Sequence, residues 1–429
     1  MDSVRQAAER SKQASYGIQN LPLSVRNAAL AAIASELGKR KDQIIRANQM
    51  DLAEGARTGL AQPLLKRLSY DEVKLDESIR SIESLVAQED TIGKVISKME
   101  LDTGLVLEKV SCPIGVIGII FESRPDALVQ IATLCLKSGN AVLLKGGSEA
   151  KETNKALASA IVAASESTDA RLKDAVQLLS TREEIRELLA LDGLVDLIIP
   201  RGSNELVRSI QSSTRIPVLG HAAGVCHTYV DEDADLEMAV RVGYDAKVQY
   251  PAVCNAMETL LVHQSIASQF LPRIAAEYAK AKVELRGDQA TRRIIAAGEA
   301  SEADWSAEYN DLILAIKVVP SLQEAIDHIN RYGSHHTDSI ITSDQAKAKQ
   351  FMDLVDSASV MWNASTRFAD GYRYGLGAEV GISTNKTHAR GPVGLEGLAI
   401  YKYRLSGEGH IVADYTGKNA KHFTHRKLA

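Results

Sequence analysis

Apolar residues recur at three- and four-residue steps through roughly the first 100 residues of the chain. The clearest example is the stretch 24–56, where Ala, Leu, Lys and Glu dominate. Steps of three and four match the turn of an α-helix, and these residue types favour helix. The N-terminal segment is therefore predicted to be helical.

The pattern changes near residue 104. Residues 104–121 are rich in β-branched side chains and are interrupted by glycine, which is typical of strands. Helix-like and strand-like segments then alternate, with Ser148 in the position of a helix cap. In chain order they are a helix at 124–140, a strand at 141–147, a helix at 148–167, a strand, turn and helix at 195–210, and a strand within 216–235. Such alternation predicts right-handed βαβ units and a doubly wound parallel sheet.

A second α/β block is predicted over residues 231–361. Its segments are a helix at 235–249, a strand at 257–263 and further strands at 312–319 and 338–344. Residues 390–412 are glycine-rich and then alternate, which predicts an edge ribbon. The predicted fold class is α/β, with two doubly wound α/β domains and a small β-hairpin and tail.

Composition narrows the choice of partner and location. The 429 residues predict two or three domains, and the net charge of −5 without a basic run does not favour nucleic acid. No apolar run approaches the ~20 residues of a membrane helix, and the N-terminus lacks a signal-peptide pattern. The cysteines and histidines show no metal-ligand spacing and no disulfide framework. We therefore expect a cytoplasmic protein without a metal or a membrane partner.

Cys254 has surroundings that differ from those of the other cysteines. Cys112 and Cys226 lie inside predicted strands and Cys135 lies on the apolar face of a predicted helix, so all three are expected to be buried. Cys254 lies in a connection that also holds a proline and an asparagine, and loops carry chemistry more often than their share. The local sequence leaves two interpretations open, a small buried side chain or a nucleophile.

Two strand-to-helix turns have the features of phosphate or ribose sites. One contains Lys145, Gly146 and Ser148, and the other contains Gly202 and Ser203 after an arginine. Free main-chain N–H groups at a helix start, together with a basic side chain, suit an anionic ligand. Neither turn has a dinucleotide or P-loop fingerprint, so each by itself is equally an ordinary βα turn. Two such turns on adjacent units favour a nucleotide.

Arginines recur at turn-like positions, and arginine binds carboxylate or phosphate through two parallel hydrogen bonds. These arginines are Arg124, Arg367, Arg373 and Arg390. The alternative is that they are merely solvated.

Several longer motifs carry a resemblance to a known family. They are PRGSNELV, IPVLGHAAG, YPAVCNAMETLL, VPSLQEAIDHINRYGSHHTDSI and NASTRFADGYRYGLGAEVGIST followed by HARGPVGLEGL. In this order, and over almost the whole chain, they resemble the γ-glutamyl phosphate reductase family of the aldehyde dehydrogenase superfamily.

The resemblance implies an activity. NADPH would reduce L-glutamyl 5-phosphate to L-glutamate 5-semialdehyde with release of phosphate, the second step of proline synthesis from glutamate. No kinase-like segment precedes these motifs, so we expect the separate reductase. Functional coupling to glutamate 5-kinase and a homo-oligomer are also implied.

The resemblance also implies three structural parts. The limits expected from it are an NADPH-binding domain at 1–102, 124–230 and 362–395, a catalytic domain at 231–361, and an oligomerisation ribbon at 103–123 and 396–429.

The resemblance assigns roles to single residues. The family's nucleophile falls on Cys254, its cofactor lysine on Lys145 and its nicotinamide-ribose glutamate on Glu308. Asn255 is a candidate for the oxyanion site. Substrate contacts are expected from Ser123, Arg124, His221 and Arg367, of which the two arginines rest on arginine chemistry.

Two departures from oxidising members of the superfamily favour reduction. The turn that carries an oxyanion asparagine in those members reads FESRP here, with Ser123 or Arg124 in its place. The segment that carries their general-base glutamate reads VLGHAAG, without a carboxylate. Without that base, a thioester is better protected from water. The rival hypotheses are an aldehyde-oxidising dehydrogenase and a non-catalytic binding or structural protein.

Overall fold

The computed structural model describes residues 3–179, 183–220 and 223–428, which form two compact units. The first unit draws on 1–219, 377–380 and 393–429, and the second on 220–376 and 381–392. Each unit contains a parallel sheet with helices, so the predicted α/β class is confirmed.

Helices open the first unit, as the three- and four-residue periodicity predicts. The stretch 24–56 is divided between two helices, which meet at Arg40. The helices are α1 (Val4–Ile18), α2 (Leu23–Lys39), α3 (Lys41–Arg57), α4 (Gln62–Leu68) and α5 (Glu72–Ala87).

Among the described residues, the parallel sheet of the first unit has the strand order β5-β4-β3-β6. Every residue of β3 and β4 is buried, because helices cover this sheet. Its strands are β3 (Val116–Phe121), β4 (Ala141–Gly146), β5 (Val176–Leu179) and β6 (Leu197–Arg201). The helices that follow them in the chain are α6 (Pro125–Lys137), α7 (Lys151–Thr168), α8 (Glu183–Leu189) and α9 (Asn204–Ser213).

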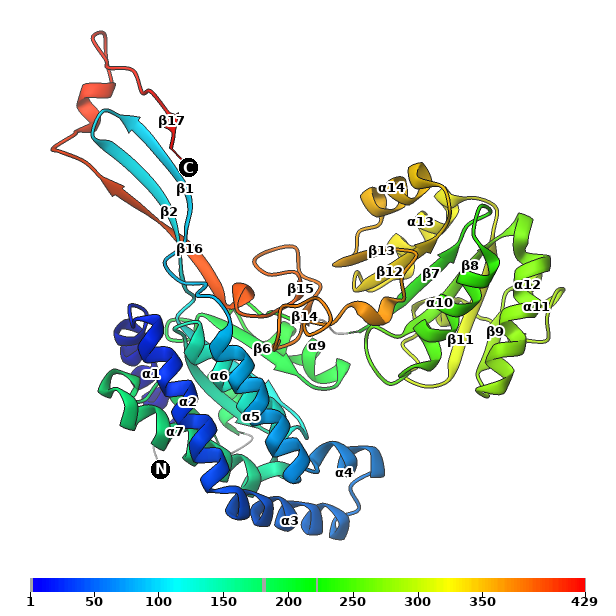
Figure 1. Ribbon diagram of the computed structural model, residues 1–429, viewed down its shortest axis with the longest axis horizontal. Coiled ribbons are helices and arrows are strands. Elements are labelled where there is room, and N and C mark those ends of the chain that lie inside the picture. Colours follow the sequence, from blue (N-terminus) through cyan, green and yellow to red (C-terminus); the bar gives the residue numbers. More distant parts are fainter. Residues whose placement is uncertain (1–2, 180–182, 221–222, 429) are drawn as a thin grey trace. The chain divides into compact units, whose positions relative to one another are not determined.

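A second, antiparallel sheet of the first unit joins segments that are far apart in the sequence (Figure 1). Its order is β16-β2-β1-β17. The strands are β1 (Val95–Asp102), β2 (Leu105–Pro113), β16 (Ala399–Ser406) and β17 (Arg426–Lys427). Large apolar side chains of β16, among them Ile400, Tyr403 and Leu405, are exposed. We call this sheet the ribbon.

The second unit is built on a parallel sheet with the order β10-β9-β11-β8-β7-β12-β13 in the described part of the chain. Its strands are β7 (Cys226–Val230), β8 (Met257–His263), β9 (Glu284–Gly287), β10 (Gly298–Glu299), β11 (Ile313–Val319), β12 (Thr337–Ile341) and β13 (Ser359–Trp362). Its helices are α10 (Leu236–Val248), α11 (Gln264–Lys280), α12 (Gln289–Arg292), α13 (Leu322–Tyr332) and α14 (Gln345–Leu354). A small antiparallel pair, β14 (Ile382–Ser383) and β15 (Gly391–Pro392), belongs to the same unit.

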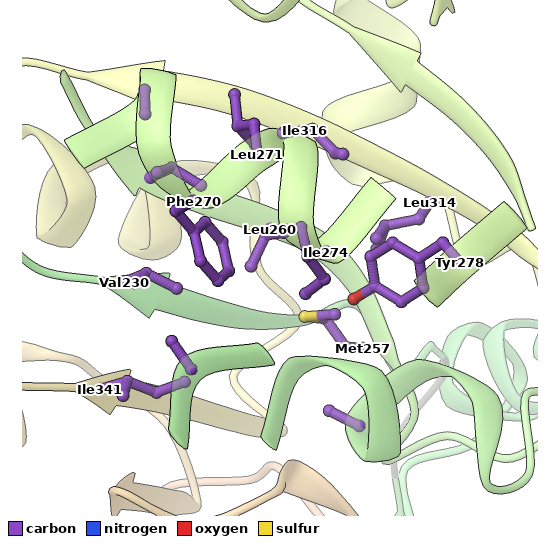
Figure 2. Packing of buried hydrophobic residues seen from close by; sticks show 14 of the residues in the cluster. Val230, Met257, Leu260, Phe270, Leu271, Ile274, Tyr278, Leu314, Ile316 and Ile341 are labelled. Carbon is purple, nitrogen blue, oxygen red and sulfur yellow. The ribbon is translucent and has the colours of Figure 1, made fainter. Parts of the chain in front are cut away.

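Both faces of this sheet are buried, and consecutive strand residues divide between them. Leu260 and Val262 join the cluster that contains Phe270 and Tyr278 of α11, which Figure 2 shows. Leu261, between them, joins a different cluster with residues of α13 and α14. Side chains alternate between the two faces of a strand, so a strand in a sheet that is covered on both faces has apolar residues at successive positions. Residues 257–263 show this pattern.

The strand boundaries correct some of the expected limits. Residues 116–121, expected in the ribbon, form β3 of the parallel sheet, and their complete burial explains this placement. Residues 95–102, expected in the cofactor domain, form β1 of the ribbon and are exposed or half-buried. Residues 226–230, expected in the cofactor domain, form β7 beside β8 in the second unit.

Candidate functional site

Cys254 lies in the connection between α10 and β8, residues 249–256, which we call the nucleophile loop. The main-chain N–H of Ala256 donates to the carbonyl of Val253 at 2.9 Å, so Cys254 and Asn255 are the central residues of a β-turn. The Cys254 side chain is partly buried, and the loop follows the C-terminal end of α10. The predicted loop position of this cysteine is confirmed.

Gly224 packs directly against the main chain of Cys254. A Cβ atom at position 224 would lie 2.0 Å from the Cys254 carbonyl oxygen and 2.5 Å from its Cα. The Cys226 thiol donates to the same carbonyl oxygen at 3.2 Å. The segment that leads into β7 therefore fixes the backbone of the candidate nucleophile.

The other three cysteines have different environments. Cys135 and Cys226 are buried, as predicted, and burial raises the pKa of both thiols well above the ordinary value. The prediction that Cys112 is buried is wrong: it is only partly buried, because it lies on β2 of the ribbon, and this partial burial still raises the pKa of its thiol. Thiols that resist ionisation are poor nucleophiles, so Cys254 remains the candidate.

Asn255 is buried, and its side-chain amide donates to the carbonyl of Ala369 at 2.8 Å. This contact turns the side chain toward the chain's own backbone. The main-chain N–H of Asn255 makes no hydrogen bond with any residue that the structure describes. The main-chain group, and not the amide, is therefore the better candidate donor for an oxyanion.

Arg367 is buried near the nucleophile loop, in the short 3₁₀ turn Thr366–Phe368. Its Nε donates to Oε1 of Gln249, the first residue of the loop, at 3.0 Å. Burial lowers the pKa of its guanidinium and Arg373 lowers it further, whereas a Cys254 thiolate raises it. The structure thus places the predicted Arg367 within electrostatic reach of Cys254.

Glu308 lies half-buried in the same unit, in the loop that precedes β11. Burial raises the pKa of Glu258, the second residue of β8, and the carboxylate of Glu308 adds to this rise. Cys254, Asn255, Glu308 and Arg367 are therefore all residues of the second unit. His221 lies outside the described residues.

Apart from Glu308, the predicted cofactor residues lie at one edge of the parallel sheet in the first unit. Phe121, the last residue of β3, pairs with Gly146 on one side and with Arg201 on the other. The carboxyl ends of β3, β4 and β6 are therefore adjacent, which is where open α/β sheets bind ligands. Lys145 is buried at this edge, and its Nζ donates to the carbonyl of Gly146.

Glycines line this edge, and side chains fill the space beside them. A Cβ atom at Gly146 would lie 2.2 Å from Asn154 Nδ2, and one at Gly202 would lie 2.4 Å from Glu122 Oε2. Oδ1 of Asn154 is buried without a hydrogen-bond partner in the described structure. A close approach of backbone and an unsatisfied polar atom are features that fit a bound dinucleotide.

Carboxylates already accept hydrogen bonds from two main-chain N–H groups at this edge. Glu149 Oε1 accepts from the N–H and the hydroxyl of Ser123 at 2.6 and 2.7 Å. Glu122 Oε2 accepts from the N–H of Ser203 at 2.9 Å. Arg124 directly precedes α6. Carboxylates in such turns suit the hydroxyl groups of a ribose.

Ser148 does not cap the following helix, contrary to the prediction. It begins a 3₁₀ turn, Ser148–Ala150, and α7 begins at Lys151. The start of α7 is held by Asp51 of α3, whose carboxylate accepts from the N–H groups of Glu152 and Thr153 at 3.1 and 2.8 Å. In contrast, Ser203 does cap α9, because its hydroxyl accepts from the N–H of Leu206.

Sequence reasoning missed the residues that position the site from a distance. Gly224 and the thiol of Cys226 act on the Cys254 backbone, and Lys247 and Glu258 form a buried ion pair next to the nucleophile loop. No local sequence pattern distinguishes these residues. No helix among the described residues is long and apolar enough to cross a membrane, and no metal-ligand cluster is found among them.

Comparison with known proteins agrees with the geometry. The sequence model of the family described as "Aldehyde dehydrogenase family" matches residues 1–298 of this chain. A γ-glutamyl phosphate reductase of Pelotomaculum thermopropionicum is 58% identical over 425 residues, which cover 99% of this chain and 98% of the relative. Another, of Acetivibrio thermocellus, is 56% identical over 426 residues, with the same shares covered.

The fold is also that of a solved γ-glutamyl phosphate reductase structure. The crystal structure of γ-glutamyl phosphate reductase from Thermotoga maritima is 42% identical, has a TM-score of 0.93, and covers 96% of this chain and 100% of its own. This chain is therefore an oxidoreductase that belongs to the aldehyde dehydrogenase family and, within it, to the γ-glutamyl phosphate reductases.

Proposed function

We propose that the protein reduces L-glutamyl 5-phosphate to L-glutamate 5-semialdehyde with NADPH and releases phosphate, as the second step of proline biosynthesis. The observation that carries the proposal is Cys254, a partly buried thiol on a fixed turn beside Arg367, in a chain 58% identical to a γ-glutamyl phosphate reductase. A cytoplasmic location and functional coupling to glutamate 5-kinase remain predictions.

The first step is acyl transfer to Cys254. Its thiolate attacks the γ-carbonyl carbon, a C–S bond forms, and the C–O bond to phosphate breaks, so phosphate leaves with its electron pair. The main-chain N–H of Asn255 donates to the oxyanion of the tetrahedral intermediate. One such donor is worth about 3–4 kcal/mol of transition-state stabilisation. Arg367 supplies positive charge next to the thiolate and, in this proposal, to an anionic group of the substrate.

The second step reduces the thioester to a thiohemiacetal, which collapses to the semialdehyde and returns the Cys254 thiolate. NADPH supplies the hydride when it is bound. The chain must protect the thioester from water until then, because hydrolysis would waste the activated substrate. The segment VLGHAAG contains no carboxylate that could act as a base toward water. This absence supports reduction in preference to aldehyde oxidation.

The cofactor would lie at the carboxyl edge of the first unit's parallel sheet. Lys145, Gly146, Ser148, Gly202 and Ser203 would hold its adenosine and diphosphate portions, since they combine a lysine with close main-chain approach. Members of the aldehyde dehydrogenase family use a nicotinamide dinucleotide. The choice of NADPH over NADH is part of the proposal.

Two further roles complete the proposal. Glu308 would bind the nicotinamide ribose, and Ser123, Arg124 and His221 would contact the substrate. The ribbon would join copies of the chain into a homo-oligomer, because Tyr401, Tyr403 and Leu405 lie on one face of β16 and are exposed, which gives this edge strand of the described sheet an apolar surface.

The test replaces Cys254 with Ser or Ala and follows the reverse reaction, phosphate-dependent reduction of NADP⁺ by glutamate 5-semialdehyde. We expect turnover to fall by about 10³-fold or more, because the nucleophile is lost. Cys135→Ala is the matched control, since Cys135 is a buried thiol outside the loop. Near-normal turnover of Cys254→Ala would refute the nucleophile. Phosphate-independent turnover by the unmodified enzyme would favour aldehyde oxidation instead.

A further inference from the structure

The second unit contains an ion pair that solvent does not reach. Nζ of Lys247 lies 2.5 Å from Oε2 of Glu258, and both side chains are fully buried. Burial raises the pKa of Glu258 to about 7 and lowers the pKa of Lys247, while each partner opposes the shift of the other. The fold therefore keeps two charges in an environment that disfavours them.

The pair joins the two ends of the nucleophile loop. Lys247 is the penultimate residue of α10, and Glu258 is the second residue of β8. The intervening residues 249–256 carry Cys254, and Cys226 is an electrostatic neighbour both of Cys254 and of the pair Lys247 and Glu258. A contact across the base of a loop restricts the positions that its turn can adopt.

The second oxygen of Glu258 extends the contact to another segment. Oε1 accepts from the main-chain N–H of Asn310 at 3.2 Å, and Asn310 has a left-handed φ of 54°. Lys247 Nζ lies 5.9 Å from the ring centroid of Tyr309, and the Tyr309 hydroxyl donates to Asp304 at 2.6 Å. The residue before Tyr309 is Glu308, the proposed ribose ligand.

We propose that Lys247 and Glu258 are positioning residues that hold the nucleophile loop and the segment 308–310 in one fixed arrangement. The inference rests on the roles proposed above for Cys254 and Glu308. An apolar pair of similar size could fill the same space and support the fold equally well. Only the carboxylate, however, can bind Lys247 and the N–H of Asn310 at the same time.

The experiment separates positioning from stability with the double variant Lys247→Met/Glu258→Met. Removing both charges together leaves no unpaired buried charge, so we expect the midpoint temperature of thermal unfolding to be close to that of the parent protein. We expect kcat of the reverse reaction to fall at least tenfold and KM for NADP⁺ to rise at least threefold. The rate at which iodoacetamide alkylates Cys254 should also change at least threefold. Lys347→Met, which removes an ion-paired lysine of the same unit, is the control and should leave all three unchanged.

Each outcome decides the matter. A folded double variant with parental kcat, KM and alkylation rate would show that the pair only stabilises the fold, and the proposal would be wrong. Should that variant fail to fold, Lys247→Met/Glu258→Gln keeps the side-chain size at position 258 and an acceptor for Asn310, and it leaves no buried charge unpaired. It should lower kcat at least threefold, and parental values in this variant would equally overturn the proposal. Alkylation of Cys254 needs no substrate, so this readout stands even where the proposed reaction fails.

Discussion

Gly224→Ala tests whether the backbone of Cys254 is held in place by close packing. The substitution adds one methyl group at a residue whose φ lies outside the left-handed region, so the effect is steric and not conformational. The new Cβ would lie 2.0 Å from the Cys254 carbonyl oxygen and 2.5 Å from its Cα. Both atoms are main chain, so no flexible side chain can move out of the way.

The structure sets the size of the displacement. Ordinary contact begins at 3.4 Å, so the Cys254 turn or the 224 segment must shift by about 1.4 Å to relieve a separation of only 2.0 Å. A misplacement of about 1 Å at a reacting group can cost about 10²-fold in rate. That factor corresponds to about 2.7 kcal/mol of activation free energy. The shift would also weaken the 3.2 Å contact from the Cys226 thiol.

The assay measures kcat of the reverse reaction, alkylation of Cys254 and thermal unfolding on the same preparation. We expect kcat to fall by about 10²-fold with the protein still folded. Gly298→Ala in β10 is the matched control, because its Cβ would meet nothing closer than 3.6 Å, and its kcat should be unchanged. A Gly224→Ala enzyme with kcat within threefold of the parent and a parental alkylation rate would refute this reasoning.

Three further predictions concern pH, a helix start and the arginine. Burial, and after it the charges of His227, Lys317 and Arg331, lower the pKa of His328 to about 2. The folded protein therefore keeps His328 neutral, whereas the unfolded chain binds a proton below about pH 6.5. The free energy of unfolding should thus be constant above about pH 6.5 and be about 2 kcal/mol lower at pH 5. Urea unfolding at pH 7 and pH 5 should show this loss in the parent and not in His328→Gln, and equal losses in both would contradict the assignment. Asp51→Ala should lower the free energy of unfolding by about 1–3 kcal/mol, because it leaves buried N–H groups of α7 unpaired. Asp71→Ala, at the exposed N-terminal cap of α5, should lower it by about 1 kcal/mol when measured by the same urea unfolding. Arg367→Met should slow alkylation of Cys254 at neutral pH at least threefold, and an unchanged rate would exclude its charge as a stabiliser of the thiolate.

Much of the fold follows from local pattern. The helical period of the first segment, the alternation of strands and helices, and the continuous apolar run at 257–263 correspond to elements of the structure. The position of Cys254 in a loop could also be predicted, because a proline and an asparagine lie in the same connection between a helix and a strand. Each of these features depends on residues that are close together in the sequence. Periodicity and turn chemistry describe such residues, so they can predict these features.

The remaining features depend on contacts between distant segments. The local sequence predicts a helix cap at Ser148, but Asp51, about 100 residues earlier, holds the start of α7. The assignment of β1 to the ribbon and of β3 to the parallel sheet depends on which strand each one meets. The amide of Asn255 could have faced a substrate, yet it binds the carbonyl of Ala369.

The sequence by itself determined the fold class, the loop that carries the proposed nucleophile and, through its resemblance to a family, the chemistry that we propose. Only the tertiary structure decided which residues contact the backbone of Cys254, namely Gly224 and Cys226, and placed the buried pair of Lys247 and Glu258 beside its loop. The physical reason is that close packing and buried ion pairs join residues whose separation in sequence carries no periodic signal, whereas amphipathic period and turn chemistry are local.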